Sequence, residues 1–462
     1  MRHATTLSFA CLCLFPIWCN PAAAADLPQY AIIEMPTFGG SNSNGIALNS
    51  NCQVTGYARI ENDTGSHCFL WTNGEMRDLG TLGGNFSYGF DINNSGVIVG
   101  TSEFKDDPPL TDNACMWTAD GHSVYLGTLG GAESWAYSVN TVGQIVGASE
   151  VDSGTARFAF IWEDGVMSPL GEVSGRPGTR AYAINESGYA VGISEDELYW
   201  KAILWHPEGT AENLGSFWDG HTYANGINDN MEITGSSDTG IGPHGFYYDY
   251  RTGELLDLQR AGYPTTSAGY SINNFGQIVG MKGDRYSGRE DAFAWDREHG
   301  MVVLDRLQPP NCNWHLRFGK DINDFGQVVG GGTRGGGGYF DLQGFLMTPV
   351  YSSFYLSKAK PGIAGEVNTV RAENFVNVPV GTTVYFCYSL HGGGTLIPGC
   401  DVSINALQLE NAKSAGSAAV DANGVATLEG VVPAKMSGRE VIFQAVIPGS
   451  CEISNLVVQR FE

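Results

Sequence analysis

The sequence predicts an all-β protein: a seven-bladed β-propeller closed by its N-terminal strand, followed by a small Ig-like β-sandwich. A phrase of the form small-x-small-Ile-Asn-x-x-Gly-x-Ile-Val-Gly recurs every 43 to 50 residues. The residues between its copies hold short apolar runs separated by Asn/Asp-Gly turns, which are typical of β-hairpins. Four strands in about 45 residues are typical of a propeller blade. The copies contain Asn49, Asn93, Asn140, Asn185, Asn228, Asn273 and Asn323.

Each repeat holds the same elements, which we name strands a to d. Strand a ends at the Asn, and strand b carries the Ile-Val-Gly run. Strand c ends in an aromatic residue, as in FAFIW at 158–162, and strand d leads to a Leu-Gly pair such as Leu126-Gly127. A parallel β-helix fits less well because its turns are shorter and lack tight hairpins. Helical repeats are excluded because no segment has an apolar period of 3.6 residues.

The two ends of the repeat array predict that the ring closes. The segment YAIIE at 30–34 precedes the first copy of the phrase, where a strand d belongs. The last repeat stops after its strand c, at 345–347, and lacks a strand d. Pairing these two segments completes the ring and removes an exposed sheet edge.

Strand a has a recurring arrangement of small and aromatic residues. Gly or Ala lies four residues before each Asn, and Ala, Gly, Ser or Asp (Asp91 and Asp321) lies two before it. Since side chains alternate along a strand, we expect both positions to face the propeller axis. Aromatic residues on the opposite face, such as Tyr137 and Tyr182, are then expected to pack between neighbouring blades. The repeated Asn itself is expected to begin a tight turn by bonding the backbone two residues on.

The chain is expected to be exported and to contain three parts. Residues 1–25 have the basic start, apolar stretch and Ala-rich end of a signal peptide, with cleavage near Ala25. Residues 26–350 are the propeller and residues 351–462 the sandwich. No other stretch is apolar enough for a transmembrane helix, so a periplasmic or extracellular location is expected. The net charge of −24 argues against nucleic acid as a partner, and a monomer is the default expectation.

Residues 30–350 resemble the HAF-type extracellular repeats of bacterial secreted proteins. The matching elements are LGTLGG at 79–84 and 126–131, the Ile-Asn-x-x-Gly phrase and the Ala-Phe-x-Trp strands. The resemblance implies an exported repeat protein and brings no established reaction, so no catalytic residue is carried over.

The C-terminal part is similar to a small module of bacterial surface and secreted proteins. Its marks are Pro398-Gly399-Cys400 and the segment at 444–455 that contains Cys451. The resemblance implies a Cys400–Cys451 disulfide, with Cys387–Cys400 as the rival pairing. The sequence leaves the pairing of Cys52, Cys68, Cys115, Cys312 and Cys387 open.

Candidate binding residues lie in the d–a and b–c loops, which vary between repeats and share one face, here called the variable face. Their carboxylates are consistent with a solvated acidic rim, with a Ca²⁺ site or with a catalytic pair. Their aromatic side chains suit sugar stacking or peptide anchoring. The candidates are Tyr88, Asp106, Asp107, Trp135, Asp152, Glu195, Asp196, Trp218, His221, Asp238, Asp284 and Trp314.

Three functions follow from these features. The first is an exported binding or scaffold protein that contacts a glycan or a protein through the variable face, without a cofactor. The alternatives are a polysaccharide hydrolase or lyase on a propeller scaffold, and a cell-surface adhesion or structural protein. No catalytic residue is assigned, because no motif selects a carboxylate pair and no nucleophile signature accompanies His221.

Overall fold

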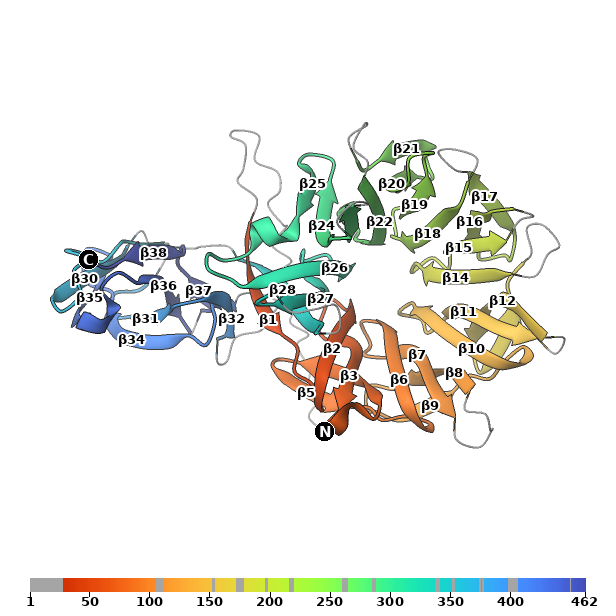
Figure 1. The fold of residues 1–462 in the computed structure, drawn as a ribbon, viewed down its shortest axis with the longest axis horizontal. Coiled ribbons are helices and arrows are strands. Elements are labelled where there is room, and N and C mark those ends of the chain that lie inside the picture. Colours follow the sequence, from red (N-terminus) through yellow and green to blue (C-terminus); the bar gives the residue numbers. More distant parts are fainter. Residues whose placement is uncertain are drawn as a thin grey trace, which may run out of the picture.

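The chain is all-β, with a ring of small sheets and a separate group of C-terminal strands beside it (Figure 1). The computed structural model describes residues 28–104, 111–151, 154–171, 178–195, 198–215, 220–259, 265–284, 288–336, 341–350, 354–373, 375, 378–397, 406–448 and 450–462. The expected signal peptide lies outside these ranges. None of the helices in the described ranges has the length and apolarity that a membrane crossing requires.

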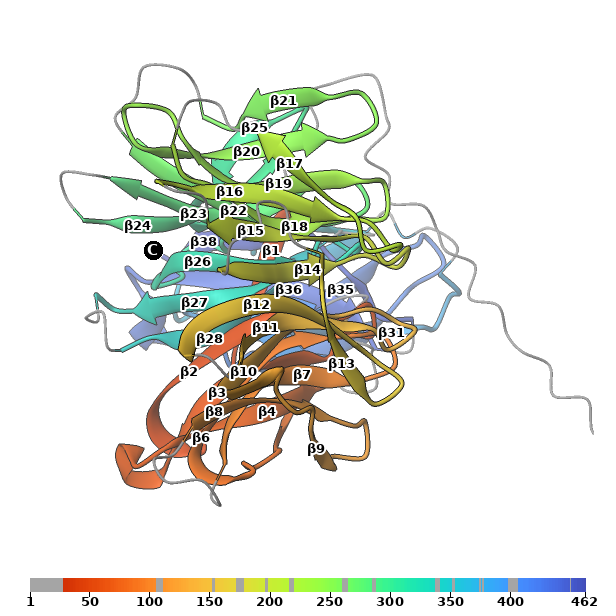
Figure 2. The same cartoon turned by 90° about the vertical axis from the view of Figure 1, so that its right-hand side faces the viewer.

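The repeats form four-stranded antiparallel units around a central opening, which makes the fold β-propeller-like (Figure 1). Within each unit the strands pair in the order a, b, c, d. Figure 2 shows the units from the side, with the C-terminal strands behind them. Units 1 and 2 share one sheet through a single parallel pair, Ser66 with Phe86.

The first four units run from residue 39 to residue 215. Unit 1 contains β2 (Gly39–Leu48), β3 (Val54–Ile60), β4 (Ser66–Thr72) and β5 (Glu75–Asp78). Unit 2 contains β6 (Gly83–Ile92), β7 (Ile98–Phe104), β8 (Thr111–Trp117) and β9 (Ser123–Tyr125). Unit 3 contains β10 (Gly130–Val139), β11 (Ile145–Val151), β12 (Gly154–Glu163) and β13 (Val166–Pro169). Unit 4 contains β14 (Thr179–Ile184), β15 (Ala190–Glu195), β16 (Trp200–Trp205) and β17 (Ala211–Gly215).

The last three units complete the ring. Unit 5 contains β18 (Thr222–Ile227), β19 (Glu232–Asp238), β20 (Pro243–Asp249) and β21 (Glu254–Asp257). Unit 6 contains β22 (Thr265–Ile272), β23 (Ile278–Asp284), β24 (Glu290–Asp296) and β25 (Gly300–Val303). Unit 7 contains β26 (Trp314–Ile322), β27 (Val328–Arg334), β28 (Gln343–Val350) and the N-terminal β1 (Gln29–Glu34).

The N-terminal strand lies where the sequence places it. β1 pairs antiparallel with β28 over six residues, from Gln29 opposite Val350 to Glu34 opposite Phe345. Its apolar side chains are buried on both faces. Tyr30 and Ile32 pack into a cluster with strands of units 6 and 7, whereas Ile33 packs with unit 1 and with the C-terminal strands.

A β-bulge in every innermost strand corrects our expectation for the small residues. In each unit the register shifts between the residues four and two before the Asn, as between Gly89 and Asp91. Because a bulge adds one residue, it reverses the facing of the side chains on one side of it. The residue four before the Asn therefore faces the preceding unit: a Cβ at Gly89 would collide with Thr55 Oγ1. The aromatic residues three before the Asn line the central channel, and there Phe90, Tyr137 and Tyr182 contact one another across neighbouring units.

The C-terminal strands form three small sheets: β29–β30–β35, β34–β31–β36–β37 with β38 on β36, and the pair β32–β33. These strands are β29 (Tyr355–Leu356), β30 (Val367–Glu373), β31 (Thr383–Ser389), β32 (Gly392–Leu396), β33 (Ala406–Leu409), β34 (Lys413–Ala419), β35 (Ala426–Val431), β36 (Glu440–Ile447), β37 (Glu452–Ile453) and β38 (Val457–Arg460).

The C-terminal strands share a core with the ring. Leu407 and Leu409 of β33 belong to the same buried cluster as Ile33 of β1. Gln408 Nε2 donates to the carbonyl oxygen of Tyr30 at 3.5 Å. Arg334 of β27 forms ion pairs with Glu34 of β1 at 2.9 Å and with Glu410 at 2.6 Å. The closing strand is therefore covered by the C-terminal strands.

The cysteines follow the expected burial. Cys68 and Cys115 are buried in β4 and β8, where burial raises the pKa of both thiols. Cys387 is a free cysteine, and Cys400 lies outside the described residues. The Cys400–Cys451 disulfide stays a prediction: non-reducing peptide mapping is expected to recover these two cysteines in one linked pair of peptides. A Cys387–Cys400 link would contradict it.

Candidate functional site

The innermost strands surround a central channel, a cavity of about 410 Å³. Its wall is built in layers, because the units contribute the same positions, from three residues before the Asn to one after it, with Asn140 of unit 3 as the exception. The lining residues one position after each Asn lie at the tight a–b turns, on the side of the ring opposite to the variable face. Lys320 is the one basic side chain among the described residues that line the channel.

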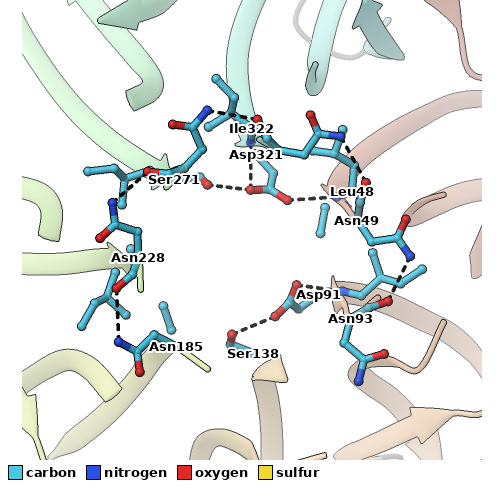
Figure 3. Close-up of a pocket in the computed structure, with 18 of the residues that line it drawn as sticks. Leu48, Asn49, Asp91, Asn93, Ser138, Asn185, Asn228, Ser271, Asp321 and Ile322 are labelled. Carbon is cyan, nitrogen blue, oxygen red and sulfur yellow. Dashed lines mark hydrogen bonds between the residues drawn. The ribbon is translucent and has the colours of Figure 1, made fainter. Parts of the chain in front are cut away.

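The repeated Asn residues form a closed ring of hydrogen bonds around this channel, and Figure 3 shows the part of the ring that runs from Asn185 through Asn228 and Asn49 to Asn93. The side-chain Nδ2 of each Asn donates to the backbone carbonyl of the Asn in the next unit, at 2.8 to 3.2 Å. The circle closes where Asn323 of unit 7 donates to Asn49 of unit 1 at 3.1 Å. Unit 7 is thereby joined directly to unit 1.

Each ring Asn also begins a tight turn, as the sequence predicts. Asn273 Oδ1, for example, accepts from the backbone N–H groups of Phe275 and Gln277, both at 3.0 Å. The left-handed position that follows is occupied by Gly in five units, and by Cys52 (φ 56°) and Met231 (φ 61°) in the other two. One side chain therefore holds its own turn and binds the next unit, and the sequence predicts only the turn.

Two carboxylates project into the channel at the position two residues before the Asn. Asp91 Oδ2 accepts from Ser138 Oγ at 2.7 Å and from the backbone N–H of Val139 at 2.9 Å, so it joins units 2 and 3. Asp91 Oδ1 accepts from its neighbour, the Ile92 N–H, at 2.7 Å. Figure 3 shows Asp91 beside Ser138 at the inner wall.

Asp321 has the same role between units 6, 7 and 1. Its oxygens accept from Ser271 Oγ at 2.6 Å, from Leu48 N–H at 2.9 Å and from Ile322 N–H at 2.9 Å. Burial raises the pKa of both carboxyl groups, and the charge of Asp321 raises the pKa of Asp91 further, to about 6. Within the described residues neither carboxylate has an ion pair.

This raised pKa predicts a pH-dependent stability. The folded protein binds a proton at Asp91 near pH 6, whereas the ordinary pKa of an aspartate is 3.8. The unfolding free energy contributed by Asp91 is therefore greatest at low pH and is lost as the pH rises through about 6. Between pH 5 and pH 7 we expect a difference of about 1 kcal/mol that disappears in Asp91→Ser. Urea unfolding at both pH values measures it, and an unchanged difference in the variant would contradict it.

The aromatic residues of the bulge form an arc on one side of the channel. Phe90 and Tyr137 have ring centroids 5.8 Å apart, and Tyr137 and Tyr182 have centroids 5.5 Å apart. Burial raises the pKa of Tyr137 to about 12. On the other side, the Lys320 ammonium lies 4.4 Å from the ring centre of Tyr270. The channel thus combines aromatic faces with uncompensated carboxylates.

The residues predicted on the variable face are only partly brought together. His221 and Asp238 meet, because Asp238 Oδ2 accepts from the His221 N–H at 3.0 Å. Trp314 is wrongly predicted as a binding residue: it is 7% exposed and packs against Phe345 in the core of unit 7. Glu195 is exposed at the end of β15. Of Asp284 only the backbone is described, and Asp106, Asp107, Asp152, Asp196 and Trp218 lie outside the described residues.

Trp135 and Tyr88 occupy equivalent positions, five residues before the ring Asn. Both are half-buried on the variable face. The Arg157 guanidinium lies 4.0 Å from the Trp135 ring centre and is 3.5 Å from Glu133 and 3.8 Å from Glu150. Tyr88 packs edge-on against Tyr57 at 5.1 Å. Trp135 is thus embedded in a charged cluster.

Several acids of the b–c loops bind backbone groups, which is a structural role that we did not predict. Glu103 Oε2 accepts from the backbone N–H groups of Asn85 at 2.7 Å and Phe86 at 3.2 Å. Asp63 accepts likewise from Ser41 at 2.8 Å. These carboxylates hold the start of the innermost strand at the variable face.

One group of side chains has the composition of a metal site. The donor atoms of Asp291, Asp305 and His315 lie within 4.8 Å of one another. Arg289 already contacts this group, at 2.7 Å from Asp291 and 3.7 Å from Asp305, and a guanidinium there disfavours a second cation.

We therefore predict little stabilisation by Ca²⁺. Millimolar Ca²⁺ is expected to change the melting temperature by no more than Mg²⁺ does, since Asp63, Glu103 and Asp238 already accept backbone hydrogen bonds and Glu150 and Glu290 pair with arginine. Differential scanning fluorimetry with each ion checks this. A shift of several degrees with Ca²⁺ alone would establish a calcium site.

No family model matches the chain, and no curated protein matches it. Among solved structures, TolB from Acinetobacter baumannii is similar at 13% identity, covering 63% of this chain and 79% of that one, with a TM-score of 0.39. A gluconolactonase from Xanthomonas campestris is similar at 11% identity, covering 72% and 98%, with a TM-score of 0.35. At these scores the likenesses carry no argument about ligand or activity.

Proposed function

We propose that this chain is an exported binding or scaffold protein, which contacts a glycan or a protein through its variable face. In this proposal the units are the blades of a seven-bladed propeller of HAF-type repeats, and the C-terminal strands are an Ig-like module. The closed Asn ring supports the first assignment, because seven units then complete one circle.

The observation that carries the binding proposal is the Trp135 cluster. A partly exposed indole lies beside a guanidinium that also contacts the carboxylates of Glu133 and Glu150. Aromatic faces bordered by planar polar groups suit both the apolar face and the hydroxyls of a sugar, and the same groups anchor peptides. Tyr88 extends the surface toward unit 2.

A glycan array followed by titration of the best ligand tests this proposal. Wild-type protein is expected to bind, and Trp135→Ala is expected to bind at least tenfold more weakly with little change in melting temperature. Phe275→Ala is the matched control, because Phe275 is an exposed aromatic residue in a tight a–b turn. Equal binding by all three proteins would refute a role for the Trp135 cluster.

One observation favours the alternative of a polysaccharide hydrolase or lyase. Burial and the neighbouring charge of Glu150 raise the pKa of Glu133, and a protonated carboxyl group is what a general acid requires. Arg157 lies between the two carboxylates and reduces this effect. Release of reducing ends that is lost in Glu133→Gln would establish the hydrolase or lyase in place of the binding protein.

A further inference from the structure

The central channel contains a second set of groups with the chemistry of a ligand site, apart from the variable face. Phe90, Tyr137 and Tyr182 present a continuous aromatic arc from three consecutive units. Asp91 belongs to the same strand as Phe90 and points into the same cavity (Figure 3). Aromatic faces next to a carboxylate are the groups that recognise organic cations.

The channel already holds one cation of its own. The Lys320 ammonium lies 4.4 Å from the ring centre of Tyr270 and 5.1 Å from that of Phe318. This contact shows that ring faces in the channel wall accommodate an ammonium group. The opposite arc, at Phe90, Tyr137 and Tyr182, has the same kind of surface.

The charge of the channel favours a positively charged ligand. Glu186, Asp229 and Asp324 follow the ring Asn residues and line the channel at the tight-turn face. With Asp91 and Asp321 deeper inside, this wall has five carboxylates and, among its described residues, the single cation Lys320. A cavity in which one sign of charge predominates concentrates ligands of the opposite sign.

An organic cation fits better than a metal ion. Ca²⁺ needs six to eight oxygen ligands. Both oxygens of Asp91 already accept hydrogen bonds, from Ile92, Ser138 and Val139, so few lone pairs remain for a metal. An ammonium head gains from the charge and the ring faces without requiring a coordination shell.

We propose that the central channel binds a small organic cation, an amine or quaternary ammonium compound. Its charged head lies near Asp91 and Asp321, and its apolar part packs on the arc of Phe90, Tyr137 and Tyr182. The site goes beyond the proposed function, since it is separate from the Trp135 cluster and needs no glycan or protein partner.

The test uses full-length mature protein and three probes: choline, its uncharged isostere 3,3-dimethyl-1-butanol, and putrescine. Isothermal titration calorimetry is expected to detect choline or putrescine at millimolar concentration or below, and to detect no binding of the alcohol. Asp91→Ser introduces the residue that units 3 and 6 have at this position, as Ser138 and Ser271. We expect it to weaken cation binding at least tenfold.

Tyr137→Leu is the second variant, because it removes a ring face and leaves every carboxylate in place. It is also expected to weaken choline binding about tenfold, whereas Trp135→Ala is expected to bind choline like the wild type. Failure of the glycan assay would leave this result unaffected, so the two proposals are tested separately. Equal binding of choline and its isostere, unchanged affinity in Asp91→Ser and Tyr137→Leu, or no binding of either cation would overturn the proposal.

Discussion

Deletion of residues 29–35 is expected to prevent the mature protein from folding as a stable monomer. The deletion removes β1, whose partner β28 then presents an unpaired edge of six residues. Exposed edges of this kind pair with other chains. Size-exclusion chromatography and circular dichroism are expected to show aggregated protein with no cooperative thermal transition.

The magnitude follows from the burial of β1. Tyr30, Ile32, Ile33 and Met35 are each at most 9% exposed. Burying a large apolar side chain stabilises a protein by roughly 1.5–3 kcal/mol, so these four together contribute about 6–12 kcal/mol. Since the unfolding free energy of a domain is about 5–15 kcal/mol, the loss is comparable with the whole stability.

Point variants separate the two contacts of β1. Ile32→Ser removes a side chain that packs with units 6 and 7, and Ile33→Ser removes one that packs with unit 1 and the C-terminal strands. Each is expected to cost about 3 kcal/mol or more. Gln29→Ala is the control, because Gln29 is exposed on the same strand. A deletion variant that melts like the parent and stays monomeric would contradict the closure of the ring by β1.

The sequence predicts the four-stranded units and their closure well. Repetition of the Ile-Asn phrase and the short N-terminal strand determine which segments pair, and the pairing of β1 with β28 confirms the closure. The position two before the Asn faces the channel as predicted, whereas the facing of the position four before it is predicted wrongly, because a bulge changes the alternation of side chains without changing residue types. The sequence does contain a signal for the correct facing. Aromatic residues recur at one position, as Phe90, Tyr137, Tyr182 and Tyr270, and packing between units alone does not require an aromatic residue there.

The candidate site is predicted less well, for physical reasons. Charge and loop position predict exposed binding residues, but Asp238 accepts a backbone N–H and Trp314 is buried. Asp91 and Asp321 share their position with Ala, Gly and Ser in the other units, and a charge at such a position indicates a special role. Which carboxylates point into the channel depends on the bulge, and this geometry has no signature in residue spacing.

The second large effect is expected from the Asn ring. Asn273 is 4% exposed and makes four hydrogen bonds: its Oδ1 accepts from Phe275 and Gln277, and its Nδ2 donates to Gln277 Oε1 at 2.8 Å and to Asn323 O at 3.0 Å. Asn273→Ala removes all four bonds: the N–H groups of Phe275 and Gln277 lose their acceptor, and Asn323 O keeps only the Gly326 N–H, with each lost bond costing about 1 kcal/mol. We expect the unfolding free energy to fall by about 4 kcal/mol, measured by urea unfolding.

Asn273→Asp distinguishes the turn from the bond between units. The aspartate keeps Oδ1 as an acceptor for the N–H groups of Phe275 and Gln277. Its second oxygen replaces the Nδ2 group that donates to Gln277 Oε1 and Asn323 O, so an oxygen then faces two other acceptors. At pH 7 this variant is therefore expected to be at least as unstable as Asn273→Ala, because a buried charge faces two acceptors. Phe275→Ala, in the same turn but with an exposed side chain, controls for the turn itself and is expected to change stability by less than about 1 kcal/mol. If Asn273→Asp unfolds at the wild-type urea concentration, the ring bond contributes nothing and the units are held together by their apolar clusters alone.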